Sequence, residues 1–165
     1  MPITGEAYRQ IGRTLAGAVS VVTARERGSN TITGLTVSTF ATVSFDPPLV
    51  MFAIQHDANS YPTIVSCRHF GVSVLRAGQD SVAARFAVKG QDKSSGVQME
   101  AGQELPVALI ADSLAQIECS TNQIFMSGDH AIVVGLVHAA RTREGGPLLY
   151  FGRRYGTFIE LPGAG

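Results

Sequence analysis

The sequence has little cysteine, little charge and no long apolar run. Its two cysteines, Cys67 and Cys119, form no CxxC pair. We interpret both as buried free thiols in a reducing cytoplasm, with a disulfide or a catalytic thiol as the alternatives. The longest uninterrupted apolar run, Leu49 to Ile54, is far too short to cross a bilayer. Residues 1–6 show no basic segment followed by an apolar one, so we predict no signal peptide and expect a cytoplasmic location.

The charge balance argues against a nucleic-acid binder. Thirteen basic and 13 acidic residues give a formal net charge of zero, whereas nucleic-acid binders usually carry a basic surplus or stripe. A net charge near zero also does little to prevent self-association. Hydrophobic residues make up 45% of the 165, which is enough for a substantial core. The length fits one domain spanning residues 1–165.

Several motifs that carry well-understood chemistry are missing. The sequence contains neither GxGxxG nor GxxxxGK(S/T), so it predicts no doubly wound dinucleotide-binding unit and no P-loop. HExxH and GxSxG are also absent. The four histidines lack the spacing of metal ligands, so no metal site is predicted. These absences leave no obvious place for metal chemistry or for hydrolysis.

Local patterns predict many short strands and two or three helices. A helix is expected over 4–16, with Thr4 as its N-cap and Gly17 as its stop, lying over one face of a sheet. Helices are also expected near 61–67 and over 81–88, and 89–104 is expected to be an irregular, ligand-covering loop. Strands are expected at 18–25, 31–45, 49–55, 70–75, 114–125, 131–143, 148–151 and 155–159. The pattern indicates a mainly β protein of the α+β class, a closed antiparallel β-barrel with a few flanking helices.

A hydroxyl-rich segment at 34–50 is the first candidate for function. Thr36, Ser38 and Thr39 offer compact donors beside backbone amides, and such groups can hold a phosphate or the polar edge of an isoalloxazine ring. The alternative is a strand with ordinary exposed hydroxyls, because β-strands favour threonine in any case.

Two further segments carry candidate side chains. Arg85 supplies a forked donor suited to phosphate and Phe86 an aromatic face, although both also suit an amphipathic surface helix. His130 follows Gly128-Asp129 in an expected hairpin, where a histidine can act on a ligand or only hydrogen-bond within the turn.

Taken together, four separated segments resemble the short-chain flavin reductase family. Residues 34–50 are similar to G-(M/F)-T-(A/V)-(N/S)-S-F-x-S-V-S-x-(D/E)-P-P-L-V, with Leu35 and Thr42 as mild departures. Residues 83–87 and 89–93 resemble (A/R)-x-x-F-A and K-x-x-D-(K/R)-F, although Ser94 stands where Phe is usual. Residues 128–130 match G-D-H, and 147–156 resemble P-L-L-(Y/F)-x-x-G-(R/K)-Y. The resemblance covers about 8–158.

The resemblance implies a fold and a set of site residues. The family's fold is an FMN-binding split barrel that usually pairs as a homodimer with flavin sites near the interface. In the family the histidine of G-D-H helps to position the nicotinamide, so His130 is the expected catalytic residue. The cofactor-binding residues that the resemblance implies are Thr36, Val37, Ser38, Thr39, Ala53, Ile54, Gln55, Asn59, Ser60, Arg85, Phe86, Ala87, Lys93, Asp129, His130 and Tyr155.

The resemblance also implies an activity. The protein is expected to pass a hydride from NADH or NADPH to FMN or FAD, and to supply the reduced flavin to a partner monooxygenase. Because the cofactors carry this chemistry, the protein needs only to stack the two rings and hold their distance. Two alternatives stay open: a reductase that keeps its flavin and reduces another acceptor, such as a metal complex, and a non-catalytic flavin-binding protein.

Overall fold

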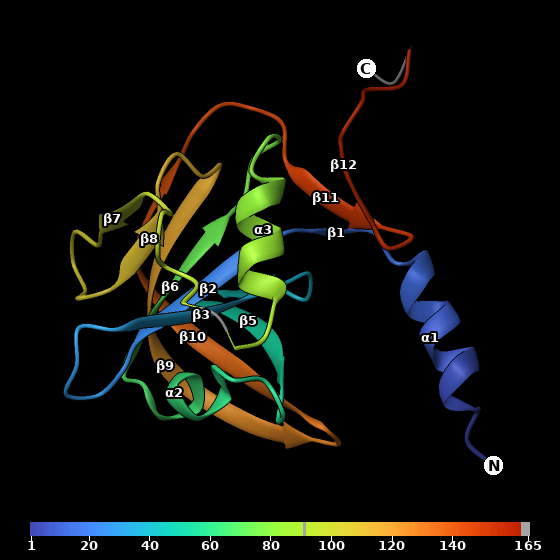
Figure 1. The fold of residues 1–165 in the computed structure, drawn as a ribbon, viewed down its shortest axis with the longest axis horizontal. Helices are drawn as coiled ribbons and strands as arrows, with labels where there is room; N and C mark the ends of the chain where they lie inside the picture. The colour runs from blue at the N-terminus through green and yellow to red at the C-terminus, as the bar shows by residue number, and fades with distance from the viewer. Residues whose placement is uncertain (91, 163–165) are drawn as a thin grey trace.

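A seven-stranded antiparallel sheet forms the body of the protein (Figure 1). The computed structural model describes residues 1–90 and 92–162. The strand order of the sheet is β3 (Ile32–Val37), β2 (Ser20–Arg25), β6 (His69–Val74), β9 (Ala115–Ser127), β10 (His130–Thr142), β5 (Pro48–Gln55) and β4 (Ala41–Phe45). A smaller sheet joins β1 (Gly17–Ala18), β11 (Leu148–Phe151) and β12 (Arg154–Thr157), and β7 (Met99–Ala101) pairs with β8 (Ala108–Ile110). With helices α1 (Gly5–Thr14), α2 (Tyr61–Ser66) and α3 (Asp80–Ala87), this confirms a mainly β protein with a few helices.

Strand β2 is buried on both faces and separates two core clusters. Successive side chains of a strand point to opposite faces, so Val22 packs with Phe52 and Phe70 while Val21 packs with Phe86 of α3. The rings of Phe52 and Phe70 meet edge to face, with centroids 5.4 Å apart. α3 therefore closes one side of the sheet, and the other cluster lies within the curve of the main sheet.

The first helix does not cover the sheet, which corrects the expectation stated above. Thr4 caps it as predicted, because its hydroxyl accepts a hydrogen bond from Ala7 N at 3.2 Å. However, α1 has no buried residue, and it projects away from the main sheet beside β1 (Figure 1). Its apolar side chains, Tyr8 and Ile11, and that of Leu15 directly after it therefore remain exposed, because the described part of the chain offers them no partner.

Other strand boundaries differ from the expected ones at places where the local sequence pattern gave little indication of a break. The single strand expected at 31–45 is two strands, β3 and β4, because the chain turns away at 38–40. β7 falls in the segment expected to be irregular, and β8 was not anticipated. Among the described residues no helix is long and apolar enough to span a bilayer. Across 1–90 and 92–162, no cluster of three or more His, Cys, Asp or Glu side chains could hold a metal ion.

Candidate functional site

Thr39 fastens the chain that follows β3 to the edge of β5. Its hydroxyl accepts a hydrogen bond from Ala53 N at 3.0 Å and lies 3.4 Å from Ala53 O, to which it can donate. Pairing between β4 and β5 has ended at Met51, so this part of the β5 edge has no strand beside it. A threonine side chain therefore satisfies the backbone there, and two predicted site residues are brought into contact.

The far end of β5 meets the turn of the β9–β10 hairpin. Gln55 is paired with His130, the first residue of β10, and the amide of His56 donates to Asp129 O at 3.0 Å. His130 Nδ1 lies 2.7 Å from Asp129 Oδ1, and this hydrogen bond holds the pKa of Asp129 below its usual value. The carboxylate fixes the ring so that Nε2 is the nitrogen left for a ligand. Gln55, Asp129 and His130 thus lie together at this end of β5.

α3 packs closely on β3. As a result, several side chains that were predicted to contact a ligand point into the protein. Gly34 lets the helix approach, because a Cβ there would lie 2.5 Å from Val22 O and 3.0 Å from Phe86 Cε1. The Phe86 ring is fully buried, so it presents no aromatic face to a ligand, which corrects that expectation. The Thr36 hydroxyl donates to Ala83 O at 2.7 Å and is likewise engaged within the protein.

Lys93 is also a structural residue here. Its ammonium donates to Gly34 O at 2.9 Å and to Phe86 O at 3.1 Å, and burial lowers the pKa of this lysine. It satisfies a carbonyl in the last turn of α3 and ties the following loop to β3. The expected ligand contact of Lys93 is therefore replaced by contacts to the backbone. Gln91, from the same motif, lies outside the described residues.

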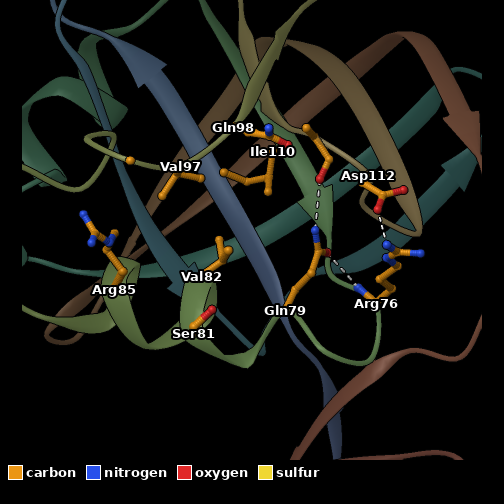
Figure 2. A pocket seen from close by; sticks show the side chains of 11 residues that line it. Arg76, Gln79, Ser81, Val82, Arg85, Val97, Gln98, Ile110 and Asp112 are labelled. Carbon is orange, nitrogen blue, oxygen red and sulfur yellow. Dashed lines mark hydrogen bonds and ion pairs between the residues drawn. The ribbon is translucent and has the colours of Figure 1, made fainter.

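Arg85, the residue before Phe86 on α3, is exposed. It lines a cavity of about 400 Å³ together with Ser81 and Val97, as Figure 2 shows. Its guanidinium donates to Ser95 O. None of the predicted residues at 36–39 or 53–60 lines this cavity, so the structure does not bring Arg85 together with them.

Lys89, a cation that contacts the β5–α2 loop, was not among the residues predicted from the sequence. Lys89 Nζ lies 2.7 Å from Asp57 Oδ2, and both side chains are exposed. This ion pair links the chain just after α3 to the loop that carries Asn59 and Ser60 and that follows the exposed Gln55 at the end of β5. Its position directly after the helix expected at 81–88 was the signal that could have selected Lys89 instead of Lys93.

The hydroxyl and ammonium donors on these elements are of the kind that suits a phosphate group. The Ser38 side chain is exposed, and Lys89 is a flexible ammonium at the surface. Ser60 Oγ is fully buried and has no hydrogen-bond partner among the described residues. Buried hydroxyls are normally satisfied, so this atom is available to a ligand or a water molecule. The side chains of Val37 and Ile54 belong to the core, and only their backbone could contact a ligand.

Tyr155 lies apart from this group. It pairs with Tyr150 across β11 and β12, with ring centroids 5.5 Å apart, and burial together with Tyr150 and Asp80 raises its pKa. The β9–β10 turn and β12 lie at opposite ends of the molecule (Figure 1). A single chain therefore does not bring Tyr155 and His130 together.

Comparison with known proteins extends over nearly the whole chain. Residues 11–158 match the family model described as "Flavin reductase like domain". The chain is 36% identical over 155 residues to the reductase component of 4-hydroxyphenylacetate 3-monooxygenase from Thermus thermophilus, covering 91% of this chain and 94% of that protein. It is also 36% identical over 158 residues to actinorhodin polyketide dimerase from Streptomyces coelicolor, covering 93% and 86% of the two chains.

A solved structure gives the same result for the fold. An NADH:FAD oxidoreductase from Streptomyces globisporus, in complex with NAD and FAD fragments, superposes with a TM-score of 0.86 at 31% identity. The match covers 100% of this chain and 99% of that one. The protein described here therefore belongs to the flavin reductase like domain family.

Proposed function

We propose that this protein is an NAD(P)H-dependent flavin reductase that uses FMN or FAD and supplies reduced flavin to a partner monooxygenase. The observation that carries the proposal is the Asp129–His130 pair beside Gln55, at the edge of β5, in a chain of this family. Relatives named as a monooxygenase reductase component and an NADH:FAD oxidoreductase support the same activity.

The residues divide into those that hold the site and those that face a ligand. When bound, the flavin supplies the group that accepts hydride, so the protein's part is to position two rings. Thr39 fixes the spacing of β3 and β5 through Ala53. His130 orients the nicotinamide through Nε2, while the Asp129 carboxylate fixes the imidazole ring of His130. Ser60 and Lys89 are the donors for a flavin phosphate. The other ligand-facing candidates are Ser38, Gln55, Asn59 and Ala87.

The proposed working form is a homodimer of single-domain split barrels in the cytoplasm. Apolar side chains gather on the elements that project from the main sheet: Tyr8, Ile11 and Leu15 on α1 and Phe158, Ile159 and Leu161 after β12. Phe45, at the end of β4, is 98% exposed. Exposed apolar groups of this extent mark an association surface, and pairing would bury them.

The activity test is stopped-flow oxidation of NADH and of NADPH by the purified protein with added FMN or FAD. We expect the protein to accelerate at least one of the four pairings and to release reduced flavin to a separate oxygenase. A tightly bound yellow flavin that turns over only with another acceptor would favour the flavin-retaining alternative. No acceleration with any pairing would show that the reductase proposal is wrong.

A further inference from the structure

A second cleft lies away from the proposed flavin site. Its volume is about 1030 Å³, and it forms where the turn between β2 and β3 faces α2 and the start of β6. The lining comes from residues 25–30, from Pro62, Thr63 and residues 66–69, and from Pro106. No residue proposed above to contact flavin or nicotinamide lines it, so the cleft is distinct from the proposed flavin site.

Positive charge is concentrated in this cleft. Arg25 and Arg27 lie on the turn side and Arg68 on the opposite side, with Glu26 as the one carboxylate in the lining. None of these three arginines has a carboxylate within 4.0 Å among the described residues. The whole chain is neutral, so a cleft with three uncompensated guanidinium groups is a local departure that favours an anion.

Some hydrogen-bonding groups in the cleft are engaged within the protein, because Ser29 Oγ accepts from Thr31 N and Ser66 Oγ donates to Pro62 O. Arg25 uses Nη1 to donate to Asn30 O and Oδ1 at 3.4 and 3.3 Å, which holds its side chain along the turn. The side chains of Arg27 and Arg68 make no hydrogen bond within the described residues, and neither does the Thr63 hydroxyl. Guanidinium forks with a nearby hydroxyl match the oxygens of a phosphate group.

We propose that this cleft binds the pyrophosphate group of a nucleotide. The arginines approach from opposite walls of a concave site, which suits a compact polyanion better than the flat face of a protein partner. Pro62, Pro106 and the half-buried Cys67 provide apolar surface for the ribose or base. The volume is that of a ligand pocket for a molecule of nucleotide size.

Two kinds of ligand could bring a pyrophosphate group to this cleft. One is a free nucleotide such as ADP. The other is the ADP half of a bound FAD, because α2 has six residues and so separates Ser60 from the cleft by only about 9 Å. The second source rests on the proposed function, whereas the first does not.

The test is calorimetric titration of ADP and of inorganic pyrophosphate into the full-length protein. Wild type should bind both, and Arg27→Glu and Arg68→Glu should each weaken binding by about tenfold or more, because a charge-assisted hydrogen bond becomes a repulsion. Arg13→Glu is the matched control, since it makes the same charge change on the polar side of α1, and it should leave binding unchanged. Absence of binding by both probes, or equal binding by all four proteins, would overturn the proposal.

A second arm separates the two sources. ADP that still binds to protein saturated with FAD identifies a separate nucleotide site, whereas ADP that FAD displaces identifies the ADP half of FAD as the occupant. Loss of FAD affinity in Arg27→Glu, with FMN affinity retained, identifies the ADP half of FAD. The ADP titration does not depend on turnover, so an inactive protein that binds ADP through these arginines would refute the reductase proposal alone.

Discussion

The hydroxyl of Thr39 serves both backbone groups of Ala53 at the edge of β5. We expect Thr39→Val, which keeps the shape of the side chain, to lower the free energy of unfolding by about 1 kcal/mol, because Ala53 N loses its partner. Flavin affinity should fall as well, because the spacing between β3 and β5 is no longer fixed. Urea denaturation and flavin fluorescence titration measure the two effects.

Thr42→Val is the matched control for Thr39→Val. Thr42 lies on β4 with its side chain exposed and without a hydrogen bond from its hydroxyl in the described structure. The Thr42→Val variant should leave both the free energy of unfolding and the flavin affinity unchanged. Equal effects of the two variants would contradict a specific role for Thr39.

His130→Ala should separate nicotinamide turnover from flavin binding. We expect kcat/KM for the nicotinamide to fall by about 10²-fold, because small losses of ring alignment cost rate steeply. Asp129→Asn should have a smaller effect in the same direction, since an amide still contacts the ring but no longer holds it as a carboxylate does. Steady-state kinetics at saturating flavin measures both variants. Unchanged turnover in His130→Ala would remove the role assigned to that side chain.

Gly34→Ala should destabilise the protein by about 1–3 kcal/mol, because the added methyl group overpacks the contact between β3 and α3. The new Cβ would lie 2.5 Å from Val22 O, and a backbone atom cannot turn aside as a flexible side chain can. Gly156→Ala is the control, since nothing lies within 4 Å of its Cβ position. Thermal unfolding of both variants is the measurement, and a Gly34→Ala protein as stable as wild type would contradict the close approach.

The sequence predicted the strands better than it predicted which side chains face a ligand. The hairpin at 128–130 was predicted because Gly128 and Asp129 interrupt two apolar segments. The family motifs selected Gln55, Asp129 and His130 separately and did not predict that they lie together. The orientation of Lys93 could not be predicted in this way. Whether a lysine four residues beyond Lys89 points to solvent or to two backbone carbonyls depends on how α3 packs against β3.

The same limit applies to α1 and to the chain after Val37. An apolar stripe at helical spacing predicts burial, but it does not say whether the covering surface belongs to the same chain. Tyr8, Ile11 and Leu15 gave a correct helix and a wrong location for it. The break at 38–40 was missed because threonine, serine and phenylalanine favour extended backbone on both sides of it.

Stability in acid should depend on Glu118. Its carboxylate accepts hydrogen bonds from Gln103 N, Glu104 N and Leu105 N at 2.7–2.9 Å. Burial alone would raise its pKa, but these bonds and Arg141 together hold the pKa below the usual 4.5. A lowered pKa in the folded state adds stability above the pKa of the unfolded chain, and that stability is lost as pH falls through the folded value.

Glu118→Gln should therefore cost about 2–3 kcal/mol at neutral pH and flatten the fall in stability below pH 4.5. Glu144→Gln, the same change at an exposed turn, should leave the acid limb as it is in wild type. Urea denaturation across a pH series makes the comparison. The same acid limb in both variants would contradict the role of Glu118.

Self-association should depend on the apolar side of α1. Light scattering coupled to size exclusion should give twice the 17.4 kDa chain mass for wild type. Ile11→Asp should yield the single-chain mass, because a carboxylate cannot be buried there without a partner. Arg13→Ala, on the polar side of the same helix, should remain paired. A wild-type protein that runs at the single-chain mass would contradict the dimer.

The elements nearest the two chain ends, α1 and β12, lie on one side of the molecule, away from the turn between β2 and β3 (Figure 1). This placement has a practical consequence for handling the protein. The exposed apolar side chains of α1 and of the segment after β12 lie close to these ends along the chain, so oligomeric state is best measured after any affinity tag has been cleaved. Conversely, attaching the protein to a surface through either end would leave the arginine-lined cleft facing the solution.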